Sequence, residues 1–309
     1  MDILARALFT PAAVMLDNLL GEPSRYHPLV GFGHLATKIE QHAYGPEGLS
    51  PAARRMRGIA AVALLLMPAF TLASVMAYLP FMEHVMSLAG LYLALGAQSL
   101  REHAEAVRRS LAAGELTEAR RAIGLIVSRD TRQLDEGKIV AATVESVLEN
   151  GCDAIFGALF WFVVGGLPGV IVYRLANTLD AMWGYRNERY REFGWAAARF
   201  DDMLNFVPAR LTALGYALCG NMPVALRAWQ TQGNRWKSPN AGPVMAAGAG
   251  ALNIRLGGPA VYHGSLTHRP ALGFGRPAET RDITRALELL QRSLLLWLFF
   301  IVTGGLLLA

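Results

Sequence analysis

The sequence predicts an all-α fold: a polytopic integral membrane helical bundle with cytoplasmic helical loops. Two observations support this class. Of the 309 residues, 53% are hydrophobic and only 17% are charged, and the mean hydropathy is +0.30, so the chain is more apolar than an ordinary soluble domain. The run from Gly58 to Leu79 contains no charged residue. At ~1.5 Å per residue it reaches ~33 Å, enough to cross a hydrocarbon core of ~30 Å.

The whole chain, residues 1–309, is predicted to form a single membrane domain. The motif GGLPG at Gly165–Gly169 divides one apolar run into two arms that are each too short to span a bilayer. A re-entrant hairpin is therefore the alternative to a crossing there. The expected membrane segments lie near residues 7–20, 58–79, 85–100, 154–173, 203–226 and 293–309, and polar functional loops cover residues 101–153, 174–202 and 227–292.

The distribution of basic residues predicts an orientation. Arg54, Arg55 and Arg57 precede the 58–79 run, whereas the link after it carries only Glu83, so the positive-inside rule places the N-terminal side in the cytoplasm. The formal charge of +5 follows from basic residues in loops beside spans, and no aromatic-basic recognition motif accompanies them, so we expect no nucleic-acid partner. The prediction is a multi-pass protein of the inner (cytoplasmic) membrane, surrounded by lipids.

A row of acids leads into one apolar run, in VESVLENGCDAIFGALFW. Glu145, Glu149 and Asp153 are spaced four residues apart, so on a helix they share one face. A helix is expected from about residue 132 to 152, beginning after Thr131. The acidic row fits either a solvated helix face or Mg²⁺ coordination, since hard divalent cations take carboxylate oxygens. Spacing alone favours the solvated face.

A second group of polar residues precedes the next apolar run. Asn177 and Asp180 share a helix face with Tyr173, and that helix is expected to stop near Gly184. The motif DDMLN then places two aspartates one turn before Asn205. Charged residues at helix centres in membranes cost ~2.5–3.5 kcal/mol each on insertion scales, so such residues are usually functional. The alternative is structural pairing, and the candidate partners of Asp201 and Asp202 are Arg199 and Arg210.

The turn SPNAG precedes a helix rich in small residues. Lys237, Ser238 and Asn240, with the amides of Ala241 and Gly242, would suit a phosphate cradle. The same pattern also fits a bare turn that leads into a close-packed helix, which is the more common meaning.

The ordered motifs LDNLLGEPSRYHPLVGFG, SRDT, VESVLEN, GGLPG, YRLANTLDAMWGYR, DDMLNFVPARL, SPNAG and LGGPAVYHG extend from Leu16 to about Gly273. Together they resemble the adenosylcobinamide-phosphate synthase family of cobalamin biosynthesis. The resemblance implies an integral membrane ligase that joins adenosylcobyric acid to (R)-1-amino-2-propanol phosphate, or to aminopropanol, in an ATP-dependent step. The chain departs from the family pattern at Glu22, where Asp is common, at Trp236, where His is frequent, and at Met245, where Glu is frequent.

The resemblance also implies roles for the polar motifs. ATP would be a co-substrate, Mg²⁺ the metal, and the corrinoid a substrate, and other membrane enzymes of late cobalamin assembly are expected partners. His27 and His263 are candidate bases, with a structural role as the alternative for each. The candidate catalytic residues are Glu145, Glu149, Asp180, Asp201 and Asp202; the metal candidates are Glu145, Glu149, Asp153, Asp202 and Asn205; and the substrate or phosphate candidates are Arg129, Asp130, Arg174, Asn177, Arg186, Lys237, Ser238 and Asn240.

A second class of function stays open at this point. A corrinoid transporter, or a noncatalytic membrane scaffold or sensor related to the family, would suit the broken apolar run at Gly165–Gly169 and the intramembrane Arg210.

Overall fold

The computed structural model describes residues 1–309 except 24–26, 81, 186 and 263–264, and the side chains of residues 260–267 also lie outside the description. The chain is 77% helical, which confirms the predicted class. It forms two compact units. The first comprises Met1–Gly96, Gly157–Asn205 and Ile301–Ala309, and the second comprises Ala97–Phe156 and Phe206–Phe300.

Two helices of the first unit start at residues whose side chains cap them. Asp2 accepts from the Ala5 amide at 2.7 Å, and Ser50 accepts from the Ala53 amide at 3.2 Å, which satisfies amides that have no partner within the helix. The unit contains α1 (Ile3–Leu20), α2 (Pro28–Ala43), α3 (Pro51–Tyr78), α4 (Met82–Ala94), α8 (Gly157–Trp183), α9 (Tyr190–Phe193) and α10 (Trp195–Leu204).

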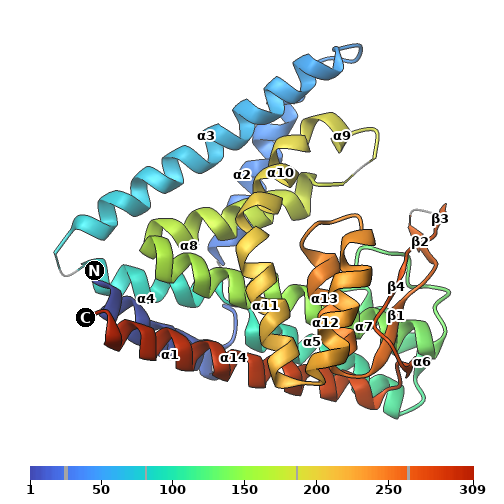
Figure 1. Cartoon of the computed structure of the whole chain (residues 1–309). Helices are drawn as coiled ribbons and strands as arrows, with labels where there is room; N and C mark the ends of the chain where they lie inside the picture. Colours follow the sequence, from blue (N-terminus) through green and yellow to red (C-terminus); the bar gives the residue numbers. More distant parts are fainter. Residues whose placement is uncertain (24–26, 81, 186, 263–264) are drawn as a thin grey trace. The chain divides into compact units, whose positions relative to one another are not determined.

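Helix α8 is a helical hairpin that reverses at Gly166. Gly166 has φ 60° and ψ −150°, which is not helical. A Cβ atom added at Gly169 would lie 2.5 Å from the carbonyl oxygen of Trp161, an approach that a straight helix cannot make over eight residues at ~1.5 Å per residue. Figure 1 shows the two arms side by side. The GGLPG motif therefore ends one arm and starts the other, which is the geometry that a re-entrant hairpin requires.

Arg6 of α1 satisfies the carbonyl groups that the reversal leaves open. Its Nη1 donates to the carbonyl oxygens of Val163, at 3.3 Å, and Val164, at 3.1 Å. These groups lie in the last turn before Gly166, where helix carbonyls lack internal partners and a positive charge is favourable. The hairpin turn is thus held by a side chain of the same unit.

We expect Gly166→Ala to lower the free energy of unfolding by about 1–3 kcal/mol, because its backbone conformation is nearly confined to glycine. Gly165→Ala is the matched control, since the neighbouring glycine has nothing within 4 Å of an added Cβ atom and no positive φ. Thermal unfolding in detergent measures both. Equal melting temperatures for the two variants would contradict the account of the turn.

A buried carboxylate on α2 holds the loop that follows α8. Glu40 is 4% exposed and accepts from Arg189 Nε at 2.8 Å and from the Tyr190 hydroxyl at 3.2 Å. The guanidinium carbon of Arg189 lies 4.7 Å from the ring centroid of Tyr44, and that of Arg54 lies 4.4 Å from the same ring, distances typical of cation–π contacts. Arg54, one of the arginines that precede the 58–79 run, therefore also packs within the unit.

The second unit combines helices with short strands in the segment after residue 253. Strand β1 pairs antiparallel with β4 and parallel with β5, and β2 pairs antiparallel with β3. These strands are an addition to the helical expectation for residues 227–292. The elements are α5 (Ala97–Ala112), α6 (Leu116–Ile123), α7 (Glu136–Gly151), the π-helix η1 (Cys152–Phe156), α11 (Phe206–Cys219), α12 (Met222–Gln232), the 3₁₀-helix η2 (Gly233–Arg235), α13 (Ala241–Ala251), β1 (Ile254–Gly257), β2 (Ala260–Tyr262), β3 (Ser265–Thr267), β4 (Ala271–Leu272), β5 (Arg276–Pro277) and the first part of α14 (Arg281–Leu307).

The helix that carries the acidic row begins later than expected. Asp135 is its N-cap, accepting from the Lys138 amide at 2.9 Å, so α7 starts at Glu136 rather than after Thr131. The wider π-turn of η1 follows it and includes Asp153. Because a π-turn holds more residues than an α-turn, Asp153 is displaced from the face on which a regular helix would place it.

Helix α13 is packed closely, as the alternative interpretation of SPNAG predicts. All of its residues are buried. An added Cβ atom would lie 2.7 Å from the Cα of Ala225 if placed on Gly250, and 2.5 Å from Leu148 if placed on Gly248. Gly250 thus lets α12 lie close beside α13 (Figure 1), and Gly248 makes room for Leu148 of α7.

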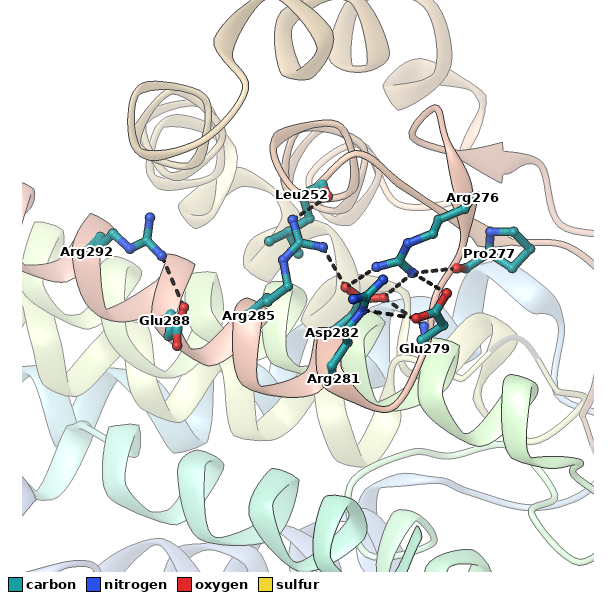
Figure 2. Close-up of polar contacts among 9 residues, drawn as sticks. All are labelled: Leu252, Arg276, Pro277, Glu279, Arg281, Asp282, Arg285, Glu288 and Arg292. Atoms are coloured by element: carbon teal, nitrogen blue, oxygen red, sulfur yellow. Dashed lines mark hydrogen bonds and ion pairs between the residues drawn. The ribbon is translucent and has the colours of Figure 1, made fainter. Parts of the chain in front are cut away.

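Asp282 anchors the start of α14 to the strands. Its side chain is 0% exposed and accepts from Arg276 at 2.6 and 3.0 Å and from Arg285 at 2.6 Å. Figure 2 shows both guanidinium groups pointing toward this carboxylate. Arg285 also donates to the Leu252 carbonyl, at 2.9 Å, one residue beyond α13. Asp282 therefore joins β5 to α14, and Arg285 extends the contact to the residue after α13.

Within the described part of the chain, four helical segments are long and apolar enough to cross a membrane: Ile3–Leu20, Pro51–Tyr78, Glu136–Trp183 and Arg281–Leu307. Large apolar side chains remain exposed along α3, such as Leu64, Met67 and Phe70, as expected for a lipid-facing surface. Two expected segments are not single helices. Residues 85–100 are divided between α4 and α5, and residues 203–226 fall in α10, α11 and α12.

Candidate functional site

The motifs YRLANTLD and DDMLN meet in the first unit, on the second arm of α8 and on α10. Asp201 is 8% exposed and Asn205 is 1% exposed. Asn205 Nδ2 donates to Asp201 Oδ2 at 3.1 Å, and Asn177 Nδ2 approaches Asp201 Oδ1 at 3.4 Å. The Tyr173 hydroxyl donates to Asn205 Oδ1 at 2.9 Å. The predicted shared face of the α8 residues is therefore the face that contacts α10.

Two further aspartates complete this acidic cluster, which we define as Asp180, Asp201 and Asp202. Asp180 lies close enough to the other two for their charges to repel its own, and Arg199 opposes that repulsion. Arg199 Nη1 forms an ion pair with Asp202 at 3.1 Å, so one of the two expected structural pairings is present. Asp180 accepts no hydrogen bond from the residues that the structure describes. Three carboxylates beside one guanidinium leave a local excess of negative charge.

Burial raises the pKa of Asp201 to about 6, and the amides of Asn205 and Asn177 oppose that rise by donating to the charged form. Asp202 adds repulsion in the same direction as burial. A carboxyl group with such a pKa changes its protonation state near neutral pH, which suits proton transfer.

The raised pKa predicts a stability change with pH. The experiment is done without Mg²⁺ or nucleotide. In the unfolded chain, Asp201 loses its proton near the ordinary aspartate pKa of 3.8, whereas in the folded protein it keeps the proton up to a pH of about 6. The folded state thus binds more protons in this window, so the free energy of unfolding falls as pH rises from about 4 to about 6. Asp201→Asn should remove this part of the slope in thermal unfolding. An identical pH dependence in both proteins would contradict the assigned pKa.

The donor set of the acidic cluster fits a cation that is shared with phosphate groups. Mg²⁺ in such sites keeps several waters and takes one or two protein carboxylates together with substrate phosphates. Over the described part of the chain, no group of three or more His, Cys, Asp or Glu side chains is arranged to hold a metal by itself. Asp180 and Asp202 could supply one or two oxygens, whereas Asn205 uses its amide oxygen on Tyr173.

Glu145 has a different environment, in the second unit. It is 2% exposed and pairs with Arg129 and with Arg269, whose Nη1 and Nη2 lie 2.8 and 3.2 Å from its oxygens. The Gly257 amide also donates to it, at 2.9 Å. Its oxygens are therefore engaged by nitrogen donors, and the side chain is not part of a solvated face. The metal role given to Glu145 stays a prediction.

The other members of the acidic row are less enclosed. Glu149 and Asp153 are half-buried, and both take part in interactions with other residues. Because η1 displaces Asp153, the three acids are not presented as one regular stripe. The metal roles given to Glu149 and Asp153 stay predictions.

The basic candidates are distributed over several contacts. Arg129 is occupied by Glu145. Asp130 accepts from Arg132, including Nη2 at 2.7 Å, and these hydrogen bonds lower its pKa to about 2. Arg174 Nη1 donates to Asn177 Oδ1 at 3.3 Å, while its Nε is buried without a hydrogen-bond partner among the described residues. Of these groups, Arg174 has both a place beside the acidic cluster and unused donor capacity.

The SPNAG turn satisfies its own amides. The Ser238 hydroxyl accepts from the amides of Asn240 and Ala241, each at 3.2 Å, and so closes the start of α13 as a side-chain turn does. Arg210 donates to the Asn240 side chain at 2.5 Å and to the Pro239 carbonyl at 3.0 Å. Arg210, the second arginine that was a candidate partner of Asp201 and Asp202, therefore bonds to this turn instead. Lys237 is exposed beside it, and the phosphate roles of these residues stay predictions.

The remaining candidates are His27, Arg186 and His263. His27 Nδ1 accepts from the Leu29 amide at 3.2 Å and caps α2, which agrees with a structural role. Arg186 and His263 lie outside the described residues.

Sequence reasoning missed two contributors. Arg269 is 124 residues from its partner Glu145 and stacks 5.1 Å from the ring centroid of Trp236, one of the positions at which the chain departs from the family pattern. Helical spacing predicts the face on which Tyr173 lies, but the hydrogen bond from Tyr173 to Asn205 depends on how α8 and α10 pack. No local pattern in the sequence indicates either contact.

The sequence is similar to those of known proteins over most of its length. A family model described as CobD/Cbib protein matches residues 10–290. Three relatives are each named "Cobalamin biosynthesis protein CobD". The one from Chromobacterium violaceum is 60% identical over 94% of both chains, that from Stutzerimonas stutzeri is 55% identical over 95% of this chain and 96% of its own, and that from Mycobacterium tuberculosis is 40% identical over 92% and 91%. No solved structure matches the chain significantly.

The motif order from Leu16 to Gly273 indicates the same family. With the family match covering most of the sequence and relatives alike over nearly their whole length, the resemblance is confirmed: the chain belongs to the CobD/Cbib family.

Proposed function

We propose that this protein acts in cobalamin biosynthesis as a membrane-bound, ATP-dependent ligase. It would join adenosylcobyric acid to (R)-1-amino-2-propanol phosphate, or to aminopropanol, to give the corresponding adenosylcobinamide. Family membership and the names of the relatives support the pathway. The observation that supports catalysis is the acidic cluster of Asp180, Asp201 and Asp202, enclosed beside the apolar helix arm of α8.

The reaction needs an activated acid. An oxygen of the corrin's free propionate attacks the γ-phosphorus of ATP, and ADP leaves with the electron pair of the broken P–O bond. The amine nitrogen then attacks the acyl carbon, phosphate leaves, and the nitrogen loses a proton. Holding both reactants in place accounts for much of the acceleration expected of such an enzyme.

The residues of the first unit divide these tasks. Asp201, with its pKa raised to about 6 by burial, would accept the proton that the amine releases. Arg174, whose Nε has no hydrogen-bond partner among the described residues, would donate to a phosphate oxygen. Asp180 and Asp202 would hold Mg²⁺, which neutralises phosphate charge when bound. The inner membrane is the proposed location, and late cobalamin enzymes are the proposed partners.

Growth of a corrinoid auxotroph that lacks its own synthase tests this function in cells. The wild-type chain should restore growth on adenosylcobyric acid, and the Asp201→Asn variant should not. Failure of the wild-type chain to restore growth, although it reaches the membrane, would contradict the proposal.

The transporter alternative predicts a different result. In proteoliposomes it requires corrinoid to move across the bilayer without any chemical conversion. We expect the corrinoid to be converted without net movement across the bilayer. The acidic cluster is hydrogen-bonded to neighbouring side chains, and ligation does not need a polar path through the membrane.

A further inference from the structure

Asn205 uses both ends of its side-chain amide. Its Nδ2 donates to Asp201 Oδ2 at 3.1 Å, and its Oδ1 accepts from the Tyr173 hydroxyl at 2.9 Å. Asn205 is 1% exposed and Tyr173 is 0% exposed, so water cannot replace either bond readily. The amide can therefore turn only if both hydrogen bonds break, and a buried polar group left without a partner is costly.

Gly157, at the start of α8, makes the position of the phenol possible. A Cβ atom on Gly157 would lie 2.0 Å from the Tyr173 hydroxyl oxygen and 2.3 Å from its Cζ. A fully buried ring cannot swing away from such a contact without moving its neighbours. The absence of a side chain at Gly157 thus leaves the space that the Tyr173 hydroxyl group occupies.

We infer that Tyr173 is a positioning residue that holds the Asp201 carboxylate through Asn205, with Gly157 providing the room for its hydroxyl. This inference rests on the proposed function, in which Asp201 belongs to the reaction site. Tyr173 itself touches no reacting atom. Its effect is to keep one carboxylate oxygen bonded inward, which fixes the direction of the other.

A parallel contact exists at the other carboxylate oxygen but is looser. Asn177 Nδ2 lies 3.4 Å from Asp201 Oδ1, and Arg174 Nη1 lies 3.3 Å from Asn177 Oδ1. Both distances are beyond the usual range of 2.7–3.2 Å for N–H···O bonds. The shorter bonds through Asn205 therefore carry the positioning.

Turnover of Tyr173→Phe measures this role. We expect kcat to fall about tenfold, as a small misplacement of a catalytic group can cause, while KM for adenosylcobyric acid changes by less than about twofold. Tyr216→Phe is the matched control, because Tyr216 is also 0% exposed and donates one hydrogen bond, at 3.0 Å, to the Leu148 carbonyl in the other unit. It should keep the wild-type kcat per mole of folded protein. A Tyr173→Phe enzyme with wild-type kcat, or an equal loss in Tyr216→Phe, would overturn the inference.

The Gly157→Ala substitution provides a second test of the Tyr173 hydroxyl group. It should lower kcat by displacing the hydroxyl, and it should add little further loss in the Tyr173→Phe background, where no hydroxyl remains. Fully additive losses in kcat would show that Gly157 acts elsewhere and would contradict its assigned role.

A stability cycle separates this inference from the proposed reaction. If the wild-type protein shows no turnover, the proposed function is wrong, and the hydrogen-bond chain is then tested by melting temperature alone. Tyr173→Phe should lower the melting temperature less in an Asp201→Asn background than in the wild type, because the chain no longer ends on a carboxylate. Equal shifts in both backgrounds would show that Tyr173 does not act on Asp201.

Discussion

Glu145→Ala should lower the free energy of unfolding by about 3–5 kcal/mol, since removing one member of a buried ion pair leaves uncompensated charge behind. The side chains of Arg129 and Arg269 are each 8% exposed and both pair with this carboxylate. The Gly257 amide would lose its acceptor as well. We expect the melting temperature in detergent to fall by roughly 10 °C.

Glu288→Gln is the matched control for this loss. Glu288 pairs with Arg292 at 3.1 Å, but the two side chains are 53% and 61% exposed, and exposed pairs contribute only about 0–1 kcal/mol. Figure 2 shows this pair apart from the bonds around Asp282. A Glu145→Ala protein that melts at the control temperature would contradict the structural role. A melting temperature that Mg²⁺ raises in the wild type but not in Glu145→Ala would instead favour the predicted metal role.

Asp201→Asn should reduce turnover by about 10²–10⁴-fold, the range expected when a general base is removed. The folded protein should survive the change, because asparagine keeps the shape and removes a charge from an acidic cluster in which burial and Asp202 both disfavour ionisation. Catalytic sites commonly trade stability for activity in this way. Steady-state kinetics and thermal unfolding on the same preparation measure both quantities.

Glu118→Gln is the control for Asp201→Asn. Glu118 is exposed on α6 and lies 3.8 Å from Arg121, so its loss should change neither turnover nor melting. Turnover by Asp201→Asn within about threefold of the wild type would contradict a proton-transfer role, which requires at least about 10²-fold.

The acidic cluster could be predicted from sequence because its geometry is local. Tyr173, Asn177 and Asp180 fall on one face by helical spacing, and Asp201 and Asn205 are one turn apart. The helix of the first motif ends where its pattern indicated, at Trp183 next to Gly184. Only the mutual packing of α8 and α10 was needed to bring the two motifs together, and apolar faces beside the polar residues supply it.

Glu145 could not be interpreted from sequence for the opposite reason. Its partners Arg129 and Arg269 lie 16 and 124 residues away, the second in a segment of strands that are only two to four residues long. Such short strands leave no periodic pattern. Spacing therefore indicated a solvated or metal-binding face, whereas tertiary contacts make this carboxylate the centre of an ion-pair cluster.

Helix ends fall inside two of the expected apolar runs, where backbone features interrupt them. Composition alone joined residues 85–100, although α4 ends at Ala94 and α5 starts at Ala97. It also joined residues 203–226, which Asn205 and the link at residues 220–221 divide. The sequence at Gly166 was open to both interpretations, because a motif such as GGLPG can kink a helix or reverse it. The approach of Gly169 to the Trp161 carbonyl decides for the reversal.

The most direct test of the central claim is a turnover assay with purified protein in detergent. Protein, ATP, Mg²⁺, adenosylcobyric acid and aminopropanol phosphate are combined, and mass spectrometry follows the corrinoid and the nucleotide. We predict adenosylcobinamide phosphate and ADP in equal amounts, with no product when ATP is omitted. Folded protein that leaves adenosylcobyric acid unchanged with either amine, while the Chromobacterium violaceum relative converts it under the same conditions, would contradict the account.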